Sequence, residues 1–269
     1  MDRQPVFSPP RDRDSSGQKE DKLFVDAAAR AFQVLEAFAD RPGPMSLSEI
    51  AAATGLDRSA VQRSAHTLLR LGYLRQAGPR GGLLPGLRIL DRNLDCMRSD
   101  PLVGRAVPFL IELRRETQER VDLAIFDDLT LVYVIRLQAR RETFLAGLAG
   151  ARVPTYCSAG GRSVLSTLSP ARVEDILARS ERKKLTPHTI ADLAGIRERV
   201  GAARRLGYAV AVEELQIGIL SLAAPILGRH REPVGAVQIT ASSVGHDPQH
   251  MAERFGPLIV EAARTIGVN

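Results

Sequence analysis

Cys157 is the residue whose surroundings could support covalent chemistry. It precedes Ser158-Ala159-Gly160-Gly161, a run that predicts the first turn of a helix. A helix N-terminus lowers the pKa of a nearby thiol and offers amide donors to an oxyanion or a carboxylate. Catalysis also needs a base, and His188 lies well away along the chain, in a Thr-Pro-His-Thr loop without the residue order of a hydrolase. The favoured interpretation is a small buried cysteine that lines a pocket, with a nucleophile or a redox sensor as alternatives.

Two adjacent carboxylates, Glu213 and Glu214, are the other candidates for acid/base chemistry. Neighbouring residues of an extended segment point to opposite sides, so we expect structural salt bridges instead. The chain has two cysteines, Cys96 and Cys157, with no CxxC or CxxH spacing, and both thiols are expected to be reduced. The histidines that fit no metal-ligand spacing are His66, His230, His246 and His250. The sequence therefore predicts no catalytic residue, no metal site and no cofactor.

A different chemistry, the reading of DNA, is indicated by the segment from Arg58 to Leu71. Its apolar side chains fall on one helical face, and its other face carries hydrogen-bond donors without a carboxylate: Ser59, Gln62, Arg63, His66 and Arg70. A helix in the major groove needs such donors, because bases and phosphates are read mainly by Arg, Gln, Ser and Lys. A basic helical face is more often only solvated, so the neighbouring elements decide between the two interpretations.

Those neighbours predict a helix-turn-helix. A helix from Asp26 carries an apolar stripe, and Ser46-x-x-Glu49 is the capping box of a second helix. Gly55 makes the turn, and Asp57 caps the third helix. Two short helices joined by a glycine turn are typical of this motif.

A β-hairpin follows the third helix. Tyr73–Gln76 and Leu83-Leu84 flank Gly78-Pro79-Arg80-Gly81-Gly82, a wing whose tip offers Arg80 to the DNA backbone or minor groove. The predicted DNA-binding residues are Ser46, Arg58, Ser59, Gln62, Arg63, His66, Arg70 and Arg80.

Charge and composition fit this interpretation. The 269 residues carry a net charge of +6, with 44% hydrophobic and 25% charged residues, as expected of a globular chain of two domains. Residues 41–92 hold eight arginines against three acids, so the basic excess is concentrated in the predicted DNA-binding segment. Residues 1–22 are polar and aperiodic, which predicts a disordered arm. No apolar run long enough for a membrane span or a signal peptide is present, so we expect a cytoplasmic protein without membrane contact.

The run RAFQVLEAFADRPGPMSLSEIAAATGLDRSAVQRSAHTLLRLGYL resembles the DNA-binding domain of the IclR family of bacterial transcription regulators. Three later segments strengthen the resemblance, which spans residues 24–268, because they occur in the order and spacing of that family. They are RVPTYCSAGGRSVLSTLSP (152–170), LTPHTIADLAGI with RRLGYAV (185–210), and EELQIGILSLAAPIL with VGAVQITAS (213–242).

The resemblance and the sequence pattern together predict an α+β protein of several domains. The expected parts are a winged helix-turn-helix at 23–86, a linker helix at 87–99 that helps to pair subunits, and a domain at 100–269 for effector binding and oligomerisation. In the last, apolar runs around Asp127-Asp128 and around Gly228–Glu232 predict antiparallel hairpins with segregated helices. The family implies a GAF-like or profilin-like sheet there.

The resemblance also implies an effector pocket. The family's contacts fall on Ala159, Gly160, Ala211, Ser221, Gln238 and Thr240, and we add Tyr156, Cys157, Leu220 and Ile239 as an apolar lining. The sequence departs from the family at Ala211, where an aspartate is common, and at Leu220, where an arginine is usual. Tyr156-Cys157-Ser158 and the run from Glu214 to Gly218 resemble the branch that senses aromatic acids.

Two functions from different classes follow. The first is a regulator that binds a near-palindromic operator as a homodimer or homotetramer, senses a small, aromatic carboxylic acid and controls catabolic genes. The alternative is a hydrolase that uses Cys157 or Glu213 and Glu214, with an accessory nucleic-acid-binding domain. The missing base partner counts against the hydrolase.

Overall fold

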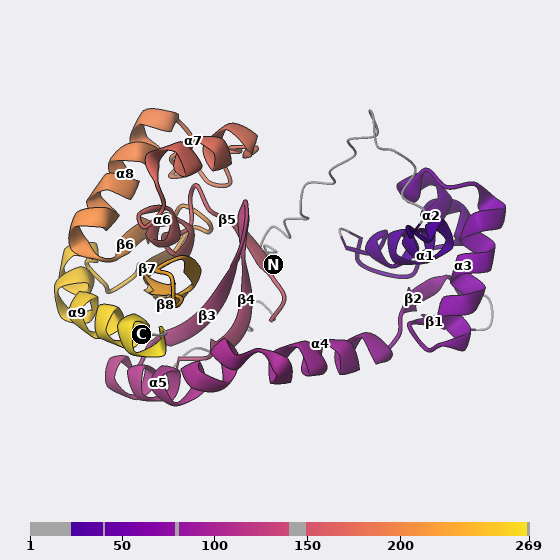
Figure 1. Cartoon of the computed structure of the whole chain (residues 1–269), viewed down its shortest axis with the longest axis horizontal. Coiled ribbons are helices and arrows are strands. Elements are labelled where there is room, and N and C mark those ends of the chain that lie inside the picture. The colour runs from indigo at the N-terminus through magenta and orange to yellow at the C-terminus, as the bar shows by residue number, and fades with distance from the viewer. Residues whose placement is uncertain (1–22, 40, 79–80, 140–148, 268–269) are drawn as a thin grey trace. The chain divides into compact units, whose positions relative to one another are not determined.

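The computed structural model describes residues 23–39, 41–78, 81–139 and 149–267 (Figure 1). The chain divides into two compact units, which meet in the sequence between Ser99 and Asp100 and are described separately below. The predicted arm, residues 1–22, and the predicted wing-tip residue Arg80 lie outside the described residues.

The N-terminal unit contains the predicted helix-turn-helix. Its helices are α1 Asp26–Glu36, α2 Leu47–Thr54 and α3 Arg58–Arg70. Ser46 and Glu49 form the reciprocal capping box at the start of α2, and Gly55 ends that helix with a left-handed φ of 72°. The carboxylate of Asp57 accepts a hydrogen bond from the amide of Ala60 and so begins α3. The predicted caps and the glycine turn are therefore present.

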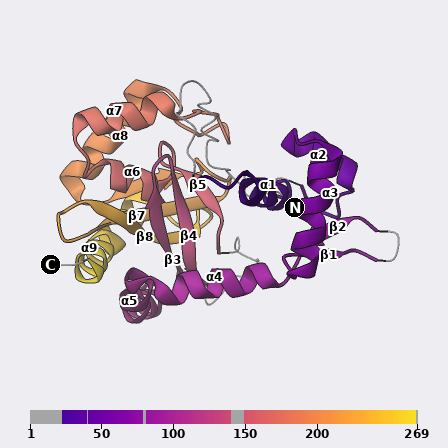
Figure 2. The same ribbon diagram turned by 45° about the vertical axis from the view of Figure 1, so that its right-hand side comes forward.

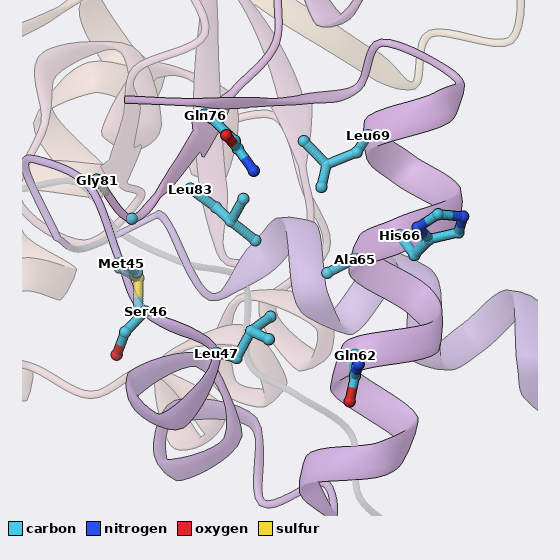
Figure 3. Close-up of a pocket in the computed structure, with 11 residues that line it drawn as sticks. Met45, Ser46, Leu47, Gln62, Ala65, His66, Leu69, Gln76, Gly81 and Leu83 are labelled. Carbon is cyan, nitrogen blue, oxygen red and sulfur yellow. The ribbon is translucent and has the colours of Figure 1, made fainter. Parts of the chain in front are cut away.

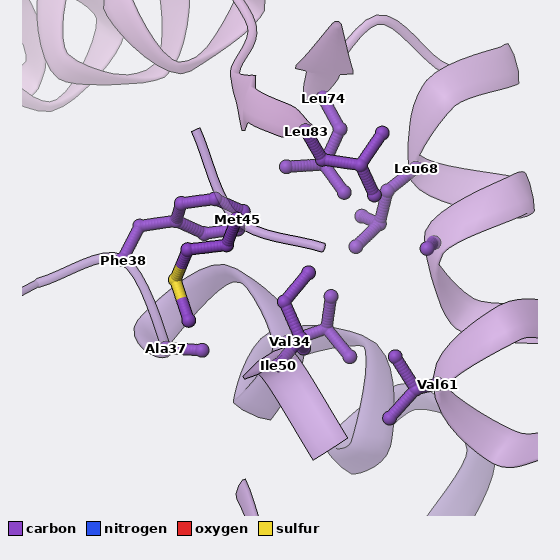
Figure 4. Packing of buried hydrophobic residues seen from close by; sticks show 10 residues of the cluster. Val34, Ala37, Phe38, Met45, Ile50, Val61, Leu68, Leu74 and Leu83 are labelled. Atoms are coloured by element: carbon purple, nitrogen blue, oxygen red, sulfur yellow. The ribbon is translucent and has the colours of Figure 1, made fainter. Parts of the chain in front are cut away.

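A two-stranded wing follows α3. Strands β1 Leu74–Gln76 and β2 Leu83–Pro85 are antiparallel, and Met45 exchanges backbone hydrogen bonds with Leu83 at 2.9 and 2.7 Å. These bonds tie the wing to the segment before α2, and buried side chains fill the space between the wing and the helices (Figure 4). The core is Val34, Ala37, Phe38, Met45, Ile50, Val61, Ala65, Leu68, Leu74 and Leu83.

The end of the wing, Leu84-Pro85-Gly86, is fixed by a close approach of two backbone segments. The amide of Gly86 donates a hydrogen bond to the carbonyl oxygen of Tyr73 at 2.8 Å, and a Cβ on Gly86 would lie 2.1 Å from the carbonyl oxygen of Gly72. Only glycine fits this approach. Helix α4 Arg88–Ser99 follows, in the segment predicted to be the linker helix, and buries none of its residues within its own unit.

The C-terminal unit is built on an antiparallel sheet. Within the described residues it has six strands in the order β5-β4-β3-β8-β7-β6. The two predicted hairpins form its centre, whereas the short strands β5 and β6 were not predicted. The elements are α5 Pro101–Thr117, β3 Arg120–Asp127, β4 Thr130–Leu137, β5 Arg152–Pro154, α6 Ala159–Leu165, α7 Pro170–Arg179, α8 Leu193–Leu206, β6 Ala209–Val212, β7 Ile219–Leu227, β8 Pro233–Ser242 and α9 Pro248–Ile266.

Helices cover both faces of this sheet (Figures 1 and 2). Helices α5 and α9 contact one face and each other, and α6 contacts the opposite face across β6, β7 and β8. Helices α7 and α8 pack outside α6 around a separate cluster that includes Leu165, Ile176 and Ile196. The arrangement confirms the predicted α+β class. Among the described residues, no helix combines the length and apolarity that a membrane crossing requires.

Candidate DNA-binding surface and effector site

The predicted reading face of α3 is exposed along its whole length. The apolar side of the helix is buried by Ala60, Val61, Ala65 and Leu68. The candidate residues on the opposite side are all exposed: Arg58, Ser59, Gln62, Arg63, His66 and Arg70. The structure therefore places these candidates together on one accessible helical face.

The one carboxylate at the start of this face is engaged by the helix itself. Asp57 accepts hydrogen bonds from the hydroxyl of Ser59 at 2.5 Å and from the amide of Ala60 at 2.8 Å, and these bonds lower its pKa. Arg63 donates to the Ser59 hydroxyl at 3.1 Å, so its guanidinium lies at the exposed surface with further N–H donors available. The carboxylate of Asp57 is therefore occupied by the start of α3, and the exposed face of α3 keeps the N–H donors of Arg63 available for DNA.

A hollow of about 400 Å³ separates α3 from the wing (Figure 3). Gln62 and His66 line it from α3, Ser46 from the start of α2, and Gln76 from β1. The hydroxyl of Ser46 donates to the Glu49 carboxylate at 2.8 Å and accepts from the Glu49 amide at 3.2 Å. The side chain of Ser46 is thus committed to capping α2, and a phosphate contact by this hydroxyl would have to replace the bond to Glu49.

Four of the predicted effector residues lie on the sheet face beneath α6: Ala211, Ser221, Gln238 and Thr240. Strand pairing sets Ala211 opposite Ser221 and Ser221 opposite Thr240, so three strands contribute one row. Gln238 lies two residues along β8 on the same face. Its amide nitrogen donates to the Thr240 hydroxyl at 2.9 Å and lies 3.5 Å from that of Ser221. We call Ser221, Gln238 and Thr240 the polar row; all three are buried.

The first turn of α6 lies directly over this row. A Cβ on Gly160 would lie 3.6 Å from the side-chain oxygen of Gln238 and 3.1 Å from Leu131. Ala159 packs against Ala211 and Ala223 in a small buried cluster. The structure therefore brings together six of the predicted positions: Ala159, Gly160, Ala211, Ser221, Gln238 and Thr240.

Leu220 requires a correction. Successive side chains of a strand point to opposite faces, and Leu220 precedes Ser221 on β7. Leu220 therefore faces the α5 and α9 side of the sheet, and Ile239, between Gln238 and Thr240, does the same. The prediction that these two side chains line the effector pocket is wrong, because it ignored strand alternation.

Tyr156 and Cys157 lie on neither face of the sheet but in a separate hydrophobic cluster. Both are buried in the hydrophobic cluster shared with α7 and α8, and the Tyr156 hydroxyl donates to the carbonyl oxygen of Lys183 at 2.6 Å. Burial raises the pKa of the Cys157 thiol to about 12. This is the reverse of the lowering that a nucleophile at a helix start needs, so the geometry gives Cys157 a packing role.

The two cysteines are therefore expected to differ sharply in reactivity. Cys96 is exposed and Cys157 is buried, so the folded protein should release one equivalent of thiolate product per chain with 5,5′-dithiobis(2-nitrobenzoate) at neutral pH. Both of the two cysteines should react in denaturant. The same titration on a Cys96→Ser variant isolates Cys157. Rapid reaction of that variant in its folded state would show an accessible thiolate and contradict the packing role.

The adjacent glutamates contact different partners, and Glu214 forms a salt bridge of the kind predicted. Glu214 is buried against Arg162, whose guanidinium makes two hydrogen bonds to the carboxylate, one of 2.7 Å from Nη2. Glu213 pairs with His188 at 3.2 Å and accepts a hydrogen bond from Ser243 at 2.7 Å, which lowers the pKa of its carboxyl. The two carboxylates share no site.

The glycines after Cys157 also have packing roles. A Cβ on Gly161 would lie 2.3 Å from the Thr155 backbone, and the Gly161 amide already donates to the Ser158 hydroxyl at 3.0 Å. One of the amides predicted to hold a carboxylate is thus used by the helix cap. The glycines allow α6 to approach the sheet closely.

A group of charged and aromatic side chains beside the polar row was not predicted from the sequence. Asp122 is fully buried between Arg120 and Arg136, and the Tyr133 hydroxyl donates to Gln238 at 3.2 Å. Burial raises the pKa of Tyr133 to about 12. The sequence signal that could have revealed this group is charge within an otherwise apolar strand, since Arg120 and Asp122 interrupt an apolar run that continues to Phe126.

Among the described residues, no group of three or more His, Cys, Asp or Glu side chains is placed to hold a metal ion.

Comparison with known proteins agrees with this architecture. Residues 27–78 match the family model of the IclR helix-turn-helix domain, and residues 95–268 match that of the bacterial transcriptional regulator IclR C-terminal domain. The chain therefore belongs to the IclR family of bacterial transcription regulators.

Individual relatives cover nearly the whole chain. The Pca regulon regulatory protein of Pseudomonas putida is 27% identical over 91% of this chain and 84% of its own length. The p-hydroxybenzoate hydroxylase transcriptional activator of Acinetobacter baylyi is 25% identical over 90% of this chain and 91% of its own. The crystal structure of an IclR family transcriptional regulator from Brucella abortus is similar with a TM-score of 0.76, at 26% identity over 93% of this chain and 94% of that one.

The family fixes the class of function. The protein is a ligand-responsive transcription regulator that binds DNA through its helix-turn-helix domain and a small molecule through its C-terminal domain. Its families and relatives are regulators and not enzymes, so the hydrolase alternative has no support.

Proposed function

We propose that the protein senses an aromatic carboxylic acid and controls genes for its catabolism. The observation that carries the proposal is the polar row, whose hydroxyl and amide groups are neutral and buried beneath small side chains. A small-molecule site typically combines an apolar lining with a few convergent polar groups. Ala211, where the family commonly has an aspartate, adds no carboxylate opposite Ser221.

The small side chains favour a flat ligand. Ala159, Ala211 and Ala223 form a cluster at one side of the row, and Gly160 covers Gln238 without a side chain of its own. An aromatic ring packs well on such a surface, and the row then offers hydrogen bonds to its substituents. The names of two relatives support this class: one is a Pca regulon regulatory protein, and the other is a transcriptional activator for p-hydroxybenzoate hydroxylase.

Removing two hydroxyls of the row should weaken binding of 4-hydroxybenzoate. A Ser221→Ala, Thr240→Ala double variant loses two hydrogen-bonding groups, each of which contributes about 0.5–1.5 kcal/mol, so the affinity is expected to fall about fivefold to 150-fold. Calorimetric titration of the full-length wild-type protein and of the double variant with 4-hydroxybenzoate, protocatechuate, pyruvate and glyoxylate measures these affinities. Thr265→Ala, which removes an exposed hydroxyl on α9, is the control.

Two results would contradict the proposal. Tighter binding of pyruvate or glyoxylate than of the aromatic acids would exclude the aromatic class. Unchanged affinity for 4-hydroxybenzoate in the double variant would exclude the polar row as the site.

We further propose that two chains pair and bind a near-palindromic operator. Helix α4 and the residue before it expose Leu87, Leu90 and Leu94, a spacing that places apolar side chains along one side. Exposed leucines in this arrangement favour pairing with a second copy. A dimer presents two α3 helices, which supports recognition of two half-sites about one helical turn, or a multiple of it, apart. Analytical ultracentrifugation and footprinting test the pairing and the spacing.

A further inference from the structure

Three charged side chains are buried together on the α6 face of the sheet. Asp122 is 0% exposed and accepts hydrogen bonds from Nε of Arg120 at 3.2 Å and from Nε of Arg136 at 3.1 Å. The side chains of Arg120 and Arg136 are only 7% and 4% exposed. Burying a guanidinium is costly unless it is paired, so the buried Arg120, which shares the carboxylate of Asp122 with Arg136, calls for a functional reason.

This charged group continues the polar row. Strand pairing sets Arg120 directly opposite Thr240 and Asp122 directly opposite Gln238. Side chains paired in this way share a face, and their Cβ atoms lie about 4.5–5.5 Å apart. Arg120 is therefore the cation next to the predicted effector contacts.

The two arginines differ in how firmly they are held. Arg136 donates to both oxygens of Asp122, from Nε and Nη2, and its guanidinium lies 4.3 Å from the centre of the Tyr133 ring. Arg120 contacts Asp122 through Nε, which uses one of its five N–H donors. Within the part of the chain that the structure describes, no second acceptor is found for Arg120. Arg120 therefore has donors left to bind a ligand.

We propose that Arg120 is the cationic partner of the effector's carboxylate and that Asp122 positions its guanidinium. The proposal rests on the proposed function only in taking the effector to be a carboxylic acid. Arginine and carboxylate form paired, charge-assisted hydrogen bonds, which suit a ligand acid beside Thr240. Arg120 would then supply a counter-ion on the effector face of the sheet, which position 220 does not reach because it faces the opposite side. The ring of an aromatic acid would extend from Arg120 along the row toward Ala211.

Comparison of an acid with its neutral amide tests the charge directly. We expect the full-length wild-type protein to bind 4-hydroxybenzoate at least tenfold more tightly than 4-hydroxybenzamide. Arg120→Gln should lower the affinity for the acid about tenfold to 100-fold and leave that for the amide unchanged, because only the acid loses a charged partner. Arg120→Lys should keep a preference for the acid. Arg264→Gln, which removes an exposed arginine paired with Glu261 on α9, is the matched control and should change neither affinity.

The possible results distinguish the proposed role of Arg120 from the proposal that the effector is an aromatic acid. Unchanged binding of 4-hydroxybenzoate by Arg120→Gln overturns the role of Arg120 and leaves the aromatic effector in place. Equal binding of 4-hydroxybenzoate and 4-hydroxybenzamide by the wild-type protein also overturns the role of Arg120. This comparison needs no variant, so it remains decisive if Arg120→Gln does not fold. Binding of pyruvate and not of the aromatic acids refutes the proposed effector class, and the same variants titrated with pyruvate and pyruvamide then decide Arg120. Binding of no carboxylic acid tested overturns both.

Discussion

Replacing Arg162 with methionine is expected to lower the free energy of unfolding of the C-terminal unit by about 3–5 kcal/mol. Arg162 is fully buried in α6, and its guanidinium bonds to Glu214 and, through Nε, to the carbonyl oxygen of Tyr156 at 2.9 Å. The variant leaves the Glu214 carboxylate buried, and among the described residues its remaining hydrogen-bond donor is the amide of Ile190 at 2.9 Å. The large effect arises from that uncompensated charge.

Urea denaturation followed by tyrosine fluorescence measures this effect. Of the four tyrosines, Tyr133, Tyr156 and Tyr208 belong to the C-terminal unit, so the emission reports mainly on that unit. Arg197→Met breaks an exposed pair with Glu174 and, as the matched control, should cost no more than about 1 kcal/mol. If Arg162→Met cost as little as Arg197→Met, the buried pair would not hold α6 to the segment that contains Glu214.

Replacing Arg63 with alanine is expected to weaken specific DNA binding by about 1–3 kcal/mol and to relax the preference at one base pair. The exposed guanidinium lies in the middle of the reading face of α3 and can donate two parallel hydrogen bonds to a guanine edge. Its bond to the Ser59 hydroxyl is made at the surface, so exchanging it for a base contact costs little.

The measurement is a titration of the full-length protein against a DNA fragment selected from genomic fragments and against single-base variants of that fragment. Arg30→Ala removes an exposed arginine from α1, outside the reading face, and serves as the control. Should Arg63→Ala keep both the affinity and the base preference of the wild-type protein, the reading face of α3 has been assigned to the wrong residues.

The N-terminal unit was predictable because its signals are local. Ser46 with Glu49, the turn at Gly55 and the cap at Asp57 each act within four residues, so the sequence alone determines where α2 and α3 begin. The face of α3 followed from helical periodicity, since Val61, Ala65 and Leu68 fix which side is buried. Tertiary contacts changed little here.

The C-terminal unit was predictable only in part. Strands β5 and β6 have three and four residues, too few for a pattern, and they exist because neighbouring strands pair with them. The role of Leu220 was misjudged because a position carried over from a family does not state which way the side chain points. Arg120 and Thr240 are far apart in the sequence, and only the register of β3 against β8 brings them together.

The central claim, that a bound effector changes DNA binding, is tested most directly by one titration. Fluorescence anisotropy of the selected DNA fragment is measured against the full-length protein, with and without saturating 4-hydroxybenzoate. We predict that the acid shifts the DNA affinity by about fivefold to 150-fold, and that the fragment shifts the affinity for the acid by the same factor, since coupling between two sites is reciprocal. Equal DNA affinities in the presence and absence of the bound acid would contradict the claim.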